Sequence, residues 1–155
     1  MTLVHYSFHY KQDTMTTTQK TTVTISAKVN APVEKVWEFW TLPKHITKWN
    51  NASDDWHTPH ASNDLRPEGK FSFRMEAKDG SFGFDFEGIY DKIKTNKFID
   101  YTIADGRKVQ IHFETVGIET VITECFEAEE TNSVELQQGG WQSILNNFKK
   151  YTESN

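Results

Sequence analysis

Residues 139–151 have the sequence GGWQSILNNFKKY. Within this segment, Trp141, Ile144, Leu145, Phe148 and Tyr151 recur at the spacing of one face of an α-helix. The periodicity predicts an amphipathic helix that begins at the two glycines. Because strand-like segments precede it, we expect a curved sheet that grips this helix and leaves a pocket between the two.

Seven segments upstream of the helix have strand character. The clearest comprises residues 70–77, where Phe71, Phe73 and Met75 alternate with polar residues, and Asp79-Gly80 after it is a strong hairpin signal. The interval 54–63 is less regular and is expected to be an irregular strand followed by a loop. The predicted strands are residues 21–30, 54–63, 70–77, 82–93, 97–103, 109–113 and 118–128.

Two short helices are predicted between the first and second strands. Asn30 suits the N-cap of the first helix, and Pro32 is tolerated in a first turn. Its apolar stripe includes Trp40, and Pro43 ends it before a second short helix at residues 44–49. The predicted order is therefore strand, two helices, six strands and one long helix, which is an α+β domain with a mostly antiparallel sheet.

Length, composition and charge limit the classes of function. The chain has 155 residues, 36% hydrophobic residues and a formal net charge of −5, which is typical of one water-soluble domain. Nucleic-acid binders usually carry a basic surface, and here the only basic doublets, Arg107-Lys108 and Lys149-Lys150, are explained by a solvated face. No segment is apolar for long enough to span a bilayer. We therefore expect neither a nucleic-acid partner nor a membrane span.

The N-terminus and the single cysteine bear on localisation. Cys125 is the only cysteine, so the chain has no intramolecular disulfide, which fits a reducing compartment. The first residues lack the continuous apolar core of a signal peptide. We expect a cytoplasmic protein with a weakly ordered N-terminal extension at residues 1–20, followed by a single domain at residues 21–153.

Several motifs in order resemble one known superfamily. The sequence NAPVEKVW at residues 30–37, followed by Leu42-Pro43 and Trp49, looks like the opening of a START-like domain of the SRPBCC superfamily, which has the Bet v-like helix-grip fold. The sequences NDLRPEGKF at 63–71 and EGIY at 87–90, with the closing Gly140-Trp141, are similar to the branch named after the activator of the ninety-kilodalton heat-shock protein's ATPase. The similarity extends over about residues 21–151.

This resemblance implies a fold rather than a reaction. The fold is a helix-grip: a curved antiparallel sheet of about seven strands wrapped around a long C-terminal helix, with two short helices after strand 1 and a cavity under the long helix. Glu68 replaces one of two glycines that often precede the residue at Phe71 in this branch, and this departure affects a turn. The superfamily includes lipid carriers, hormone receptors, cyclases and co-chaperone domains, so fold alone does not assign function.

Aromatic and aliphatic residues on the predicted inner faces are the candidates for a cavity lining. Ligand pockets are mostly apolar with a few placed polar groups. The alternative is a solid core that the same rings fill, and the sequence leaves both open. The candidate lining residues are Trp40, Phe71, Phe73, Met75, Phe84, Phe86, Ile111, Phe113, Trp141, Leu145 and Phe148.

Three polar residues are candidates for contact with a ligand. His57 and His60 lie in an acidic segment, but Pro59 between them breaks the geometry of a zinc site, so we expect a loop at the pocket mouth and no metal. Glu124 would be a buried carboxylate if the face with Ile122 and Phe126 points inward. If Val121, Thr123 and Cys125 point inward instead, Glu124 lies on the surface.

Three functions from different classes remain. Binding of a small hydrophobic or aromatic ligand ranks first. A cyclase-type or hydrolase-type enzyme that uses polar residues of the same pocket ranks second, with no catalytic residue assigned. A chaperone-associated interaction module ranks third, and a homodimer stays open. The chain has no Walker loop, GxGxxG or Ser/His/Asp order, which argues against motif-bearing hydrolases and nucleotide binders. We expect no cofactor.

Overall fold

A seven-stranded antiparallel sheet and three helices make up the part of the chain that the computed structural model describes, residues 20–155. The expected extension at residues 1–20 lies outside this range except for Lys20. The strands are β1 (Thr22–Val29), β2 (Trp56–Asn63), β3 (Lys70–Ala77), β4 (Gly83–Lys94), β5 (Phe98–Ile103), β6 (Lys108–Val116) and β7 (Glu119–Glu127). The helices are α2 (Val33–Thr41), α3 (Pro43–Trp49) and α4 (Val134–Ser154).

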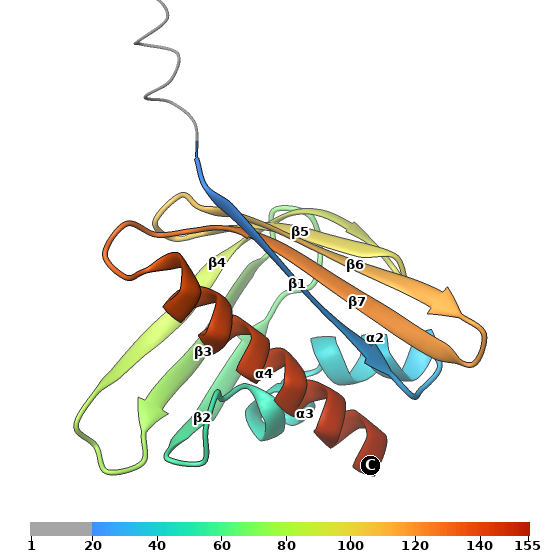
Figure 1. Cartoon of the computed structure of the whole chain (residues 1–155), viewed down its shortest axis with the longest axis horizontal. Coiled ribbons are helices and arrows are strands. Elements are labelled where there is room, and N and C mark those ends of the chain that lie inside the picture. The colour runs from blue at the N-terminus through green and yellow to red at the C-terminus, as the bar shows by residue number, and fades with distance from the viewer. Residues whose placement is uncertain (1–19) are drawn as a thin grey trace, which may run out of the picture.

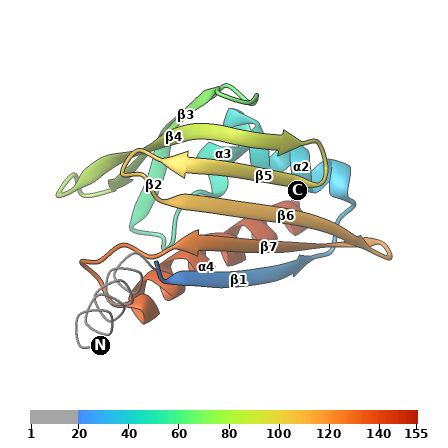
Figure 2. The ribbon, with the colours of Figure 1, turned by 90° about the horizontal axis from the view of Figure 1, so that it is seen from above.

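The strand order explains how the sheet surrounds the long helix. The order is β1-β7-β6-β5-β4-β3-β2, so the meander from β2 to β7 is completed by β1, which returns to pair with β7. Helix α4 runs across the concave side of the sheet, and α2 and α3 close one end of it (Figure 1). Seen from above, the sheet covers the helices (Figure 2). This architecture confirms the predicted helix-grip α+β fold.

Alternation of side chains along the strands builds the concave face. In β6, Val109, Ile111 and Phe113 are buried, while the residues between them are exposed. In β7, the buried side chains include Glu124 and Phe126, because β7 pairs with β6 in a register that places Glu124 opposite Ile111. Successive side chains of a strand point to opposite faces, so this register settles which face of β7 points inward.

Helices α2 and α3 follow β1 as predicted and supply tryptophans to the core. The N-cap of α2 is Pro32 rather than the predicted Asn30. Pro43 occupies the first turn of α3, where a missing N–H costs nothing. The Trp49 indole Nε1 donates a hydrogen bond to the Phe39 carbonyl oxygen at 2.9 Å, which fixes α3 against α2. The rings of Trp40, Trp49 and Phe148 lie with their centroids 4.8–4.9 Å apart, and this cluster joins α2, α3 and α4.

Helix α4 begins at Val134, earlier than the glycine pair from which periodicity predicted it to start. The Ser133 side chain caps it by accepting a hydrogen bond from the Leu136 amide at 3.1 Å. Towards its C-terminus, Asn147 Nδ2 donates to the Trp49 carbonyl oxygen at 2.7 Å, and Lys149 Nζ donates to the Lys28 carbonyl oxygen at 2.6 Å. Within residues 20–155, no helix combines the length and apolar character needed to cross a membrane.

Substitution of glycine by alanine should have opposite effects on stability in α4 and in β4. A Cβ atom at Gly139 meets open space, so Gly139→Ala should stabilise the protein by about 1 kcal/mol through helix propensity alone. A Cβ atom at Gly88 would lie 2.8 Å from the Phe71 ring and against the Thr102 carbonyl oxygen, so Gly88→Ala should destabilise it. Urea unfolding of both variants measures the change in the free energy of unfolding that each substitution causes. A loss of stability in Gly139→Ala would contradict this account of α4.

Candidate functional site

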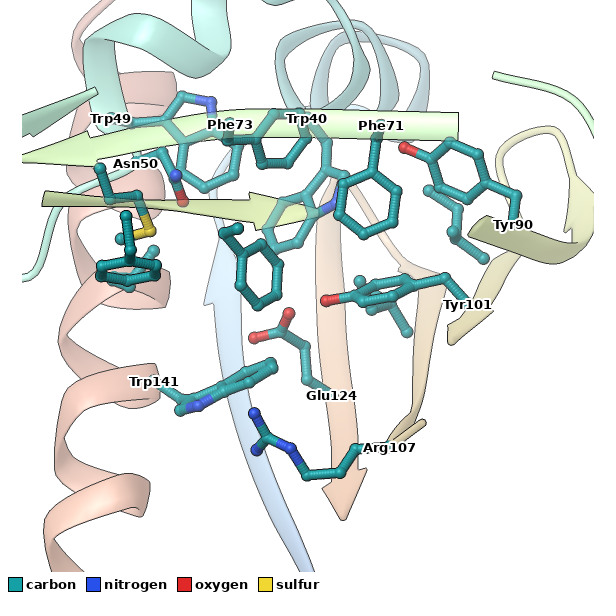
Figure 3. A pocket seen from close by; sticks show the side chains of 16 residues that line it. Trp40, Trp49, Asn50, Phe71, Phe73, Tyr90, Tyr101, Arg107, Glu124 and Trp141 are labelled. Carbon is teal, nitrogen blue, oxygen red and sulfur yellow. The ribbon is translucent and has the colours of Figure 1, made fainter. Parts of the chain in front are cut away.

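A cavity of about 260 Å³ lies between the concave face of the sheet and helix α4 (Figure 3). Strands β3 and β4 supply aromatic rings to one wall, and α2, α3 and α4 supply tryptophans to the others. The rings contact one another, as the Phe86 and Trp141 centroids, 6.1 Å apart, show for the sheet and α4. Of the candidates from the sequence, those that line the cavity are Trp40, Phe71, Phe73, Met75, Phe84, Phe86, Ile111, Trp141 and Glu124.

Other candidates lie elsewhere. Phe113, Leu145 and Phe148 are buried in the core beside the cavity rather than along its lining. His57 and His60 lie on β2, away from the lining, and His57 Nε2 is 3.5 Å from Glu76 Oε1. Within residues 20–155, no group of three His, Cys, Asp or Glu side chains is placed to hold a metal ion.

Sequence reasoning missed seven lining residues. They are Trp49, Asn50, Tyr90, Ile99, Tyr101, Arg107 and Ile144. Ile99 and Tyr101 alternate along β5 with the same two-residue period as the other strands, so their inward direction had a detectable signal. Arg107 had none, because a basic doublet after a turn is ordinarily solvated.

Glu124 is a carboxyl group on an apolar floor. It is 5% exposed, and its partners across the sheet are Ile25 on β1 and Ile111 on β6. No hydrogen bond or ion pair to its carboxyl group occurs among the described residues. Because burial disfavours the charged form, the pKa of Glu124 rises from 4.5 to about 8. The group is therefore mostly protonated at neutral pH.

Tyr101 is a titratable neighbour of Glu124 on this floor. Its side chain is buried on β5, and its hydroxyl points into the cavity, as does the carboxyl group of Glu124 (Figure 3). Burial raises the pKa of Tyr101 well above its usual value, and the charge of Glu124 raises it further. The phenol therefore stays protonated and can donate a hydrogen bond.

Arg107 lies at the edge of the cavity with its charge already engaged. Its Nε is 2.9 Å from Asp105 Oδ2, and its Nη1 donates to the Glu127 carbonyl oxygen at 3.3 Å. Asp105 lies just ahead of it across the turn at Gly106, and the guanidinium points into the pocket beside Glu124 and Trp141 (Figure 3). This turn explains why a residue from a basic doublet reaches the pocket.

The opposite wall has polar groups that already have partners. The Tyr90 hydroxyl donates to Asn63 Oδ1 at 2.6 Å, and Asn50 Nδ2 donates to Thr58 Oγ1 at 3.2 Å. These hydrogen bonds tie α3 and β4 to β2. The unengaged carboxyl and hydroxyl of the cavity are thus concentrated on the floor at Glu124 and Tyr101.

Comparison with known proteins places the chain in a family. The family model described as Activator of Hsp90 ATPase homolog 1-like protein matches residues 30–153. Among curated proteins, no relative matches the chain.

Solved structures agree with this match. The solution structure of the AHSA1-like protein from Aeromonas hydrophila is 40% identical, with a TM-score of 0.82 over 86% of this chain and 93% of that chain. Chr148 from Cytophaga hutchinsonii is 56% identical, with a TM-score of 0.75 over 86% of this chain and 92% of that chain. SA2116 from Staphylococcus aureus, a protein of unknown function, shares the fold at 14% identity and a TM-score of 0.65 over 88% and 96% of the two chains. The chain therefore belongs to the Activator of Hsp90 ATPase homolog 1-like family.

Proposed function

We propose that the protein binds a small, mostly apolar aromatic ligand in the cavity between the sheet and α4. The observation that carries this proposal is the cavity itself, about 260 Å³ and walled by aromatic side chains. A cavity of about 150 Å³ is enough to hold a benzene ring, so this one has room for two fused rings. It lies just below the range of about 300–1,000 Å³ that drug-sized ligands occupy.

The packing of the core favours a cavity that stays open rather than one that closes easily. Trp40 and Trp49 pack against Phe148 on one side and line the cavity on the other. Trp141 stacks on Phe126, with ring centroids 4.0 Å apart and planes 10° apart. Rings held in this way cannot collapse inward without losing these contacts, which favours a preformed site.

A thermal-shift screen with naphthalene derivatives tests the proposal. A ligand at about one hundred times its Kd should stabilise the protein by about 2.7 kcal/mol, which corresponds to a rise in Tm of about 5–10 °C. Ile144→Phe, which fills the cavity from α4, should abolish the rise. Leu136→Phe adds the same ring to an exposed position of the same helix and should retain it. No rise in the wild type with any derivative, or an equal rise in Ile144→Phe, would refute binding at this site.

An enzyme that uses the same cavity is the second candidate, and Glu124 is the observation that favours it. A carboxyl group with a pKa of about 8 is suited to give and take protons near neutral pH. Product analysis of every compound that binds in the screen separates the two functions, because a binding protein returns its ligand unchanged.

A further inference from the structure

The floor of the cavity offers two hydrogen-bond donors that are both uncharged at neutral pH. The Tyr101 hydroxyl comes from β5 and the Glu124 carboxyl group from β7, with Ile111 of β6 on the strand between them. Both groups point into the same space (Figure 3). We propose that the ligand is an uncharged aromatic carbonyl compound whose oxygen accepts hydrogen bonds from Tyr101 and Glu124. This inference rests on the proposed binding function.

The first support is that both side chains are mostly buried, while their oxygens face the cavity without a hydrogen-bond partner among the described residues. Among residues 20–155, neither the Tyr101 hydroxyl nor the Glu124 carboxyl group takes part in a hydrogen bond within the protein. A polar group that leaves water without gaining a hydrogen-bond partner destabilises the protein, and a ligand that supplies the partner removes this cost. Tyr90 and Asn50, which line the same cavity, have their hydrogen-bond partners. The unsatisfied pair therefore marks the place where a polar group of a ligand would gain most.

The second support is the protonation of the pair. Tyr101 and Glu124 both carry their protons at neutral pH, because burial raises both pKa values. Two O–H groups that converge in an apolar site match the two lone pairs of one carbonyl oxygen. A tyrosine beside a neutral carboxylic acid holds a substrate oxygen in this way in ketosteroid isomerase.

Charged ligands fit the same floor less well. An anionic ligand would place its charge beside two uncharged donors, and the Arg107 guanidinium at the cavity edge already shares its charge with Asp105 through Nε. An ammonium ligand offers only donors, so it would require Glu124 to ionise in an apolar site. An uncharged acceptor avoids both costs.

The titratable surroundings predict how binding responds to pH. Of the described residues that line the cavity, those with an ionisable side chain are Tyr90 on β4, Tyr101 on β5, Arg107 before β6 and Glu124 on β7. The residues that α2, α3 and α4 contribute to the lining carry none. Burial raises the pKa of both tyrosines above 10.0, so Glu124 is the group that titrates in the accessible range. Loss of its proton above about pH 8 removes one donor to the carbonyl oxygen.

Calorimetric titration with three matched probes tests the inference. Naphthyl methyl ketone, ethylnaphthalene and naphthylethylamine share one ring system and differ in the polar group. The wild type at about pH 6 should bind the ketone roughly tenfold more tightly than the hydrocarbon, and the amine most weakly. Tyr101→Phe should lose most of this preference and still bind the hydrocarbon.

The pH dependence separates a direct contact from a structural role. In the wild type the preference for the ketone should fall as pH rises through about 8. In Glu124→Gln it should stay constant, because the amide remains a donor at every pH. A structural role for Glu124 would change the affinities of the ketone and the hydrocarbon together.

The remaining outcomes are distinguishable. Equal affinity of the wild type for ketone and hydrocarbon would overturn the inference that Tyr101 and Glu124 bind a carbonyl oxygen. The proposal that the cavity binds a ligand would stand. Tightest binding of the amine overturns it in favour of an ionised Glu124. Failure of all three probes to bind overturns both this inference and the proposed function.

Discussion

Glu124→Gln should be more stable than the wild type by about 3 kcal/mol near pH 7, an unusual gain from a single substitution. In the unfolded chain this carboxyl group loses its proton around pH 4.5, whereas in the folded protein burial holds its pKa at about 8. Between these values the folded state binds one more proton than the unfolded state. Stability is therefore fully present below about pH 4.5 and falls by about 1.4 kcal/mol per pH unit until about pH 8.

The measurement is urea unfolding of both proteins across this pH range. Glutamine has the shape of the protonated carboxyl group and does not titrate, so the two stability curves should meet at low pH and diverge as pH rises. Glu114→Gln, at an exposed position of the neighbouring strand β6, controls for the loss of a surface charge and should change stability little. Parallel curves for Glu124→Gln and the wild type would show that Glu124 does not retain its proton on folding.

Phe148→Ala should destabilise the protein by about 3–5 kcal/mol. The ring is 0% exposed and packs edge-on against Trp40 and Trp49, so its removal leaves a void where α2, α3 and α4 meet. Tryptophans on two helices cannot move together to refill the void, because the Trp49 indole is held by its hydrogen bond to Phe39. Thermal and urea unfolding both report the loss.

Leu136→Ala is the matched control in the same helix. Leu136 is 64% exposed, so its truncation removes little buried surface and should cost less than about 0.5 kcal/mol. A similar cost for the two substitutions would mean that α4 is stabilised by its own propensity rather than by the aromatic cluster at its C-terminal half.

The architecture was predictable because the hydrophobic periodicity of each segment and the order of the segments along the chain determine it. Phe71, Phe73 and Met75 share a face by simple alternation, and the stripe from Trp141 to Tyr151 identifies the long helix. The start of α4 was not predictable, because the residues VELQQ between the Ser133 cap and Gly139 bury only Gln137 and so form no clear apolar stripe.

Which residues line the cavity is harder to predict than which residues lie on the inner face of the sheet. Alternation shows that Phe113 and Phe71 both point inward, but the position of α2 and α3 decides that Phe113 joins the core and Phe71 lines the cavity. Glu124 was ambiguous because both faces of β7 mix apolar and polar residues, and only its pairing with β6 resolves the direction. Such features depend on contacts between distant segments, which local sequence patterns do not encode.

Trp40 and Trp49 belong both to the core and to the cavity wall, and this limits how ligand specificity can change in this fold. Any substitution that enlarges the site at these tryptophans also removes packing around Phe148. On the strand side, Phe84 and Met75 line the same cavity while remaining partly exposed, so they can change at much smaller cost in folding free energy. New ligand preferences should therefore arise by substitutions in the β3–β4 hairpin, while the tryptophans of the helical wall stay unchanged.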